Sequence, residues 1–79
     1  MSRLAEKLAD QIAAECIRHI EKTGDEDIVT VLSQVMGDSS QTLQEAFITS
    51  ARGQRAALRA QRILARRVAD AAAASGKDG

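Results

Sequence analysis

The fold is decided by residues 41–74, QTLQEAFITSARGQRAALRAQRILARRVADAAAA. This stretch has no proline and consists mostly of good helix formers, so it predicts one helix of about 33 residues and about 50 Å. Gly53 is the position that argues for a break, because glycine costs about 1 kcal/mol relative to alanine inside a helix. Gln54 and Arg55 are poor N-caps for a new helix after Gly53. We therefore expect a continuous helix, with a break at Gly53 as the alternative.

Two shorter helices are expected before this stretch. Over residues 3–22, apolar side chains recur at four-residue steps, which indicates an amphipathic helix. Gly24 is a natural left-handed C-cap for that helix. Asp25 is then expected to be the N-cap of a second helix, over roughly 26–36, that ends at Gly37. The short turn between the two helices predicts a helical hairpin. The candidate N-caps of the long helix are Asp38, Ser39 and Ser40, and a capping box of Thr42 with Glu45 is the alternative start.

The composition fits one small folded domain. The chain has 79 residues, 44% of them hydrophobic and 28% charged, which is ordinary for a folded protein near the lower size limit. We expect an all-α domain over residues 1–75 and a disordered tail over 76–79. One cysteine cannot close an intrachain disulfide, so we expect a cytoplasmic protein. No stretch approaches the ~20 apolar residues of a membrane span, so we expect no membrane association.

Bulky apolar residues and charges are both distributed unevenly. Of the 19 Leu, Ile, Val, Met and Phe residues, 15 lie in residues 1–50, so the C-terminal third cannot build its own core. Residues 1–50 hold 4 basic and 9 acidic side chains, whereas residues 51–79 hold 7 basic and 2 acidic ones. The zero net charge of the chain therefore hides a strong dipole, which favours an acidic partner for the basic segment.

The hairpin is too short to cover the whole third helix, so a second chain is expected to cover the rest. The third helix carries an alanine-rich apolar seam at nearly coiled-coil spacing, with glutamines that can fix register. We therefore predict a homodimeric helical bundle; the alternative is a monomer with a partly exposed helix. The predicted dimer interface comprises Phe47, Gln54, Leu58, Gln61, Leu64, Ala65 and Val68.

The most specific feature is a row of arginines, called the arginine row below, spaced 3, 4, 3 and 4 residues apart. Its members are Arg52, Arg55, Arg59, Arg62 and Arg66. At 100° per residue they occupy an arc of roughly 80°, which we expect to lie opposite the apolar seam. Guanidinium forks suit carboxylates and phosphates, so we predict that the row and Arg67 bind a larger protein with an acidic surface. The alternative is that the arginine row is a solvated helix face that binds no partner.

Direct DNA or RNA binding is the second interpretation of the row. Residues 29–48 weakly resemble a helix-turn-helix, which would place the long helix against DNA. Two observations count against it: Phe47 is the sole aromatic residue, so stacking platforms are absent, and the net charge is zero. Nucleic acid therefore stays a possible partner, behind protein.

No catalytic pattern stands out in the sequence. Cys16 and His19 are neighbours on the first helix, but Cys16 lies within the apolar stripe, where a thiol is usually inert packing. A metal site shared by Cys16 and His19 of two chains is the less favoured reading. Phosphate-binding loops and paired Cys-x-x-Cys motifs are absent. We expect no enzyme, cofactor or metal, but a small intracellular regulator, adaptor or inhibitor.

Overall fold

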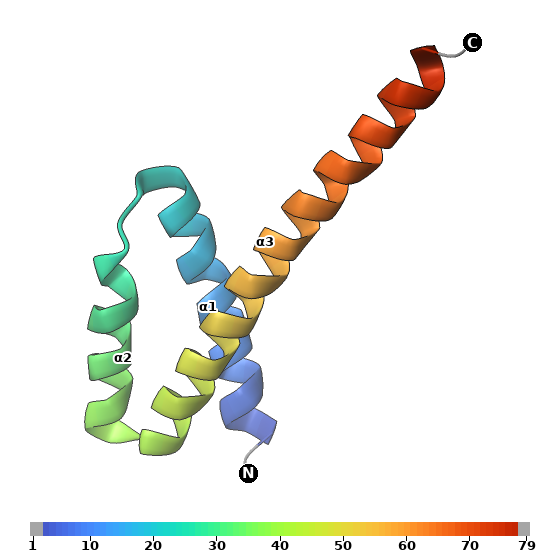
Figure 1. The fold of residues 1–79 in the computed structure, drawn as a ribbon. Helices are drawn as coiled ribbons and strands as arrows, with labels where there is room; N and C mark the ends of the chain where they lie inside the picture. The colour runs from blue at the N-terminus through green and yellow to red at the C-terminus, as the bar shows by residue number, and fades with distance from the viewer. Residues whose placement is uncertain (1–2, 78–79) are drawn as a thin grey trace.

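Three α-helices make up the computed structural model, which describes residues 3–77 (Figure 1). They are α1 (Arg3–Thr23), α2 (Asp27–Ser39) and α3 (Gln41–Lys77). No strand occurs in the described part of the chain, so the predicted all-α class is confirmed. The principal extents are 61 × 28 × 13 Å, because the second half of α3 continues well beyond α1 and α2.

α1 and α3 run in the same direction, and α2 runs the opposite way (Figure 1). α1 and α2 both pack on α3 and have very little contact with each other, so the predicted hairpin does not form a packed pair of helices. Asp10 contacts Ser50 near the start of the pair, and Glu21 contacts Arg62 near its end. The offset in residue number thus stays at 40 or 41 along both helices, as parallel neighbours require. α1 therefore covers α3 only as far as about Arg62.

The turn after α1 is built as the sequence predicts. Gly24 has φ 75°, and its N–H donates to the carbonyl of Ile20 at 2.7 Å. This left-handed residue closes the helix, because glycine adopts a positive φ at little steric cost. The Thr23 hydroxyl donates to the His19 carbonyl at 2.8 Å and accepts the N–H of Asp25 at 3.1 Å. The predicted C-cap at Gly24 is confirmed.

The start of α2 differs from the prediction. Asp25 is not the N-cap; Glu26 takes that position, with helical φ and ψ angles and no capping hydrogen bond from its side chain. The carboxylate of Asp25 instead accepts from Nε2 of His19 at 3.0 Å. Asp25 therefore connects the turn to α1 through His19. Local capping preference does not predict this contact between a turn and a neighbouring helix.

The end of α2 also corrects the prediction, because the helix passes through Gly37 and ends at Ser39. Gly37 leaves room for Gln44: a Cβ at this position would lie 2.7 Å from Cδ of that side chain. The Gln44 amide crosses there to donate to the carbonyl of Ser33 at 2.9 Å. Ser40 then stands alone between α2 and α3, and its Oγ accepts the N–H of Leu43 at 3.1 Å. Ser40 is thus the N-cap of α3.

The core is small and centres on Phe47, which is fully buried. α1 supplies most of the buried surface around it, α2 adds one methionine, and α3 adds a neighbouring alanine. The other buried residues are Ala9, Ala13, Cys16, Ile17, Ile20, Met36 and Ala51. Alanines at the α1–α3 contact allow the two helices to approach closely, which suits a core with few bulky side chains.

α3 is continuous through Gly53, so the predicted unbroken helix is confirmed. Every described side chain from residue 59 to residue 76 is exposed. We call residues 59–77 the projecting segment. The helix includes Gly76 and Lys77, which the sequence assigned to a disordered tail over 76–79; residues 78 and 79 lie outside the described residues.

Candidate interaction surface on the third helix

Two members of the arginine row are engaged within the chain. Arg55 Nη2 lies 2.8 Å from Oε1 of Glu26 at the start of α2, and Arg62 pairs with Glu21 near the end of α1. The paired side chains are 39–61% exposed, so each pair contributes at most about 1 kcal/mol. The sequence predicts an acidic partner surface for the whole row. The same chain provides these two carboxylates.

The remaining members form a separate line, which we call the outer arginine line: Arg52, Arg59 and Arg66. Among residues 3–77, no carboxylate forms an ion pair with any of them. They are seven residues apart, so their Cα atoms recur about every 10.5 Å along the helix and span about 21 Å. The row is thus divided into paired and unpaired arginines, a division that helical spacing alone does not reveal.

The sequence predicts that the row lies opposite the apolar seam of α3. In the structure it does not lie opposite the buried face. Arg55 follows Ala51 by four residues and precedes Leu58 by three, so it lies on the edge of the buried face. At 100° per residue, the centre of the row is about a quarter turn from Phe47. The outer arginine line is roughly opposite Leu64 instead, on the projecting segment. A contact through Leu64 therefore leaves this line accessible.

Three residues of the predicted dimer interface are used within the chain. Phe47 is fully buried and has no surface left for a second chain. The Gln54 amide donates to the carbonyl of Asp10 at 3.1 Å and to Oγ of Ser50 at 3.0 Å. Leu58 is half-buried beside Ile17 of α1. The core of one chain therefore extends along α3 as far as Leu58, into the predicted dimer interface.

The other predicted interface residues are exposed on the projecting segment. Leu64 is 64% and Val68 59% exposed, and Gln61 and Ala65 lie beside them. Ile63, which the sequence analysis did not single out, is 58% exposed. It lies 100° around the helix from Leu64, on the side of the outer arginine line. Arg67 is exposed and lies nearer to Leu64 than to the arginine row.

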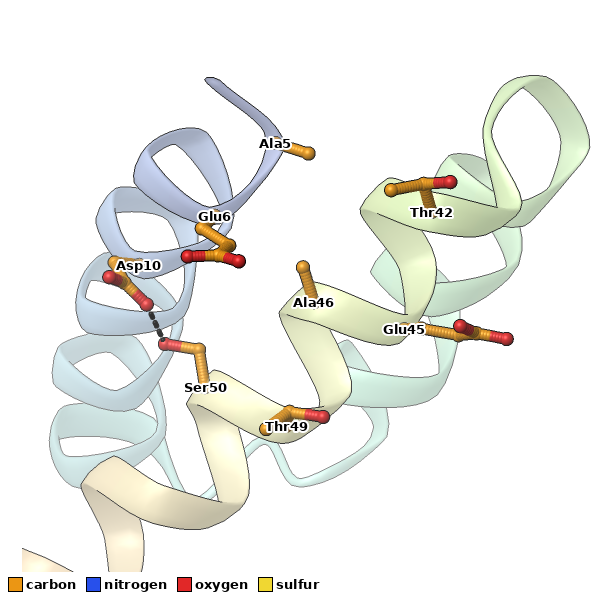
Figure 2. A pocket seen from close by; sticks show the side chains of 8 residues that line it. All are labelled: Ala5, Glu6, Asp10, Thr42, Glu45, Ala46, Thr49 and Ser50. Atoms are coloured by element: carbon orange, nitrogen blue, oxygen red, sulfur yellow. Dashed lines mark hydrogen bonds between the residues drawn. The ribbon is translucent and has the colours of Figure 1, made fainter. Parts of the chain in front are cut away.

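An open groove of about 810 Å³ runs between the first halves of α1 and α3 (Figure 2). Glu6 and Asp10 of α1 and Glu45 of α3 line it. Ala46 on α3 faces the α1 side, and the Glu45 side chain points away from α1 at the outer edge of the groove. Oγ of Ser50 donates to Asp10 at 2.6 Å, and the side-chain amide of Gln41 donates to Glu45 at 3.3 Å. Glu6 and Glu45 are exposed along the rim. We call this feature the acidic groove. No sequence pattern indicates this groove, because it is formed by residues about 40 positions apart.

The other candidate residues have structural surroundings. Cys16 is buried, and burial raises the pKa of its thiol, which keeps it protonated. His19 holds Asp25 in the α1–α2 turn. Within residues 3–77, no group of three or more His, Cys, Asp or Glu side chains is placed to hold a metal ion. None of the described helices has an apolar stretch long enough to cross a membrane.

The segment that weakly resembles a helix-turn-helix has a different junction. α2 runs through residues 37–39, where that motif would have its turn, and only Ser40 separates it from α3. A helix-turn-helix needs a turn of about three or four residues to set its two helices. The geometry therefore adds no support to the nucleic-acid interpretation.

No family model matches the chain, and no curated protein or solved structure matches it either. Its function must therefore be inferred from its own surfaces. The outer arginine line, the exposed Leu64 face and the acidic groove are the features that its own core leaves without a role.

Proposed function

We propose that this chain is a non-enzymatic protein-binding module, a small cytoplasmic regulator, adaptor or inhibitor that forms a homodimer and docks on a larger protein. The outer arginine line carries the proposal. Three guanidinium groups with no ion pair in the described part of the chain follow one edge of a rigid helix for about 21 Å. Such a line matches a partner surface with carboxylates at similar intervals.

The dimer is proposed from the exposed apolar face of the projecting segment. Leu64 and Val68 are more than half exposed and lie four residues apart, on the same side of α3. A short segment with little bulk of its own gains stability when a second chain covers it. The outer arginine line is on the far side of the helix, so dimerisation and partner binding do not compete.

An acidic protein surface is the better partner for the arginines than nucleic acid. Glu21 and Glu26 lie beside the row, where they would repel phosphates as well as pair with Arg62 and Arg55. A folded partner can avoid these two carboxylates and contact the outer arginine line alone. DNA or RNA binding through the same arginines remains the alternative outcome of the test.

The test is recovery of the partner from the native host with a tagged chain, with and without nuclease treatment. The informative variant is R52E/R59E/R66E, which removes the outer arginine line without breaking any ion pair of the described fold. Its matched control is K7E/R18E/K22E, which makes the same change in net charge at exposed positions of α1.

We expect a protein that survives nuclease treatment, is lost with the arginine variant and is retained with the α1 control. Loss of all bound material on nuclease treatment would support nucleic acid instead. In that case affinity should also fall by a factor of about a thousand or more between 50 and 200 mM salt. Equal binding by both variants and the unmodified chain would refute any role for the outer arginine line.

A further inference from the structure

We infer that the dimer is antiparallel: the projecting segment of each chain lies in the acidic groove of the other, with Leu64 packed on the second copy's Ala46. This inference rests on the homodimer proposed above and specifies its geometry. It assigns a role to the groove, which the functional proposal leaves empty.

The first argument is that one face of α3 carries both halves of the contact. Helical steps of three or four residues connect Ala46, in the groove, to Leu64 on the projecting segment. The intermediate positions on this face are Ser50, Gly53, Ala57 and Ala60. The bulky side chain, Leu64, lies at one end of this face, and the acidic groove lies at the other end. A parallel pair would place Leu64 on Leu64 and leave both grooves empty, whereas an antiparallel pair places each Leu64 in a groove.

The second argument is charge. The projecting segment holds five basic residues and one acidic residue, Asp70, so its net charge is +4. The groove presents the carboxylates of Glu6, Asp10 and Glu45. Arg67 lies three residues after Leu64, one helical turn farther along, which brings it to the Glu45 end of the second copy's groove. A parallel pair would align two segments of charge +4 side by side, and these repel.

The third argument is Gly53. A Cβ at this position meets no atom of its own chain within 4 Å, so the fold of one chain does not require glycine there. In an antiparallel pair the residue number rises along one helix as it falls along the other, so the numbers of two facing residues have a constant sum. This sum is about 110 when Leu64 faces Ala46. Gly53 then faces Ala57 of the second copy, close to the two-fold axis, where two helices with small side chains can approach closely. Close packing of the two helices in the dimer would thus explain why position 53, inside a helix, is glycine.

The first test is the oligomeric state, measured by light scattering and sedimentation for the full chain and for two adjacent single variants. L64D should weaken the dimer by about a hundredfold or more, because two leucines are lost from one interface. I63D is the matched control, since Ile63 is similarly exposed but lies on another face. It should leave the dimer intact. Circular dichroism checks that both variants keep their helices.

The orientation is tested by disulfide trapping between chains that carry A46C or L64C. Mixing the two variants should trap the A46C–L64C pair under mild oxidation, and the unmodified chain, whose Cys16 is buried, should trap nothing. Trapping of L64C with itself would overturn the antiparallel arrangement and leave the homodimer standing. A monomer at all concentrations, or a dimer equally sensitive to I63D, would overturn it too. Loss of partner binding by the arginine variant is a separate readout that none of these outcomes decides.

Discussion

Alanine substitutions at Gly53 and Gly37 should change stability in opposite directions, although both glycines lie inside α-helices. At Gly53 an added Cβ meets nothing within 4 Å, so only the backbone preference changes. Alanine is favoured over glycine in a helix interior by about 1 kcal/mol. Gly53→Ala should therefore stabilise a single chain by about 1 kcal/mol, which raises the melting temperature by about 4–8 °C in a domain of this size.

At Gly37 the same gain in helix preference is outweighed by the cost of displacing the neighbouring Gln44 side chain. A Cβ there would lie 2.7 Å from Cδ of Gln44, so the amide must move and release the carbonyl of Ser33. Loss of a partly buried hydrogen bond of this kind costs about 1–3 kcal/mol. After the gain of about 1 kcal/mol from helix preference, Gly37→Ala should destabilise the chain by about 1 kcal/mol.

Thermal melts followed by circular dichroism measure both effects, with L64D as the common background so that dimerisation does not contribute. The double variant G37A/Q44A isolates the cause, because removal of the amide leaves room for the Cβ. In the Gln44→Ala background, Gly37→Ala should become stabilising. If Gly37→Ala raises the melting temperature as much as Gly53→Ala does, Gln44 is not the reason for glycine in α2.

Two further predictions concern the core. Phe47→Ala should cost about 3–5 kcal/mol in urea unfolding, because the ring is fully buried, whereas Ile63→Ala on the projecting segment should change stability by less than about 0.5 kcal/mol. Burial raises the pKa of Cys16 above 9.0, so the folded chain holds the thiol proton more firmly than the unfolded chain does. Stability should be unaffected by this group below pH 9.0, decline as the pH rises through the raised pKa, and lose that decline in Cys16→Ala.

The features that could be predicted from the sequence are those with local causes. The four-residue apolar steps of α1, the left-handed turn at Gly24 and the unbroken α3 all follow from helix periodicity and from glycine and proline chemistry. The end of α2 could not be predicted in this way. Gly37 resembles a C-cap in the sequence, and only the crossing of Gln44, seven residues later, shows that it is a packing glycine.

The residues of the candidate site could be predicted from the sequence. Which of them are used within the chain and which stay exposed could not. Helical spacing places five arginines in one arc, yet it does not show that Arg55 and Arg62 meet Glu26 and Glu21 of the same chain. It likewise groups Phe47 with Leu64, although α1 covers the first and leaves the second exposed. Both distinctions depend on how far α1 reaches along α3. That reach is set by the offset of 40–41 residues between the two helices, a tertiary quantity with no local signal.

The distribution of charge and bulk explains why a second chain suits this fold. Burial of apolar surface is the main stabilising term in folding, and here it is limited to a few side chains around Phe47. The projecting segment adds no buried side chain to the core over its described residues 59–76, yet its ordering costs backbone entropy. Its charge of +4 and its exposed Leu64 match a groove with three carboxylates and a small floor residue, Ala46. In the proposed dimer, the dipole hidden by the zero net charge is the feature that aligns the two copies antiparallel.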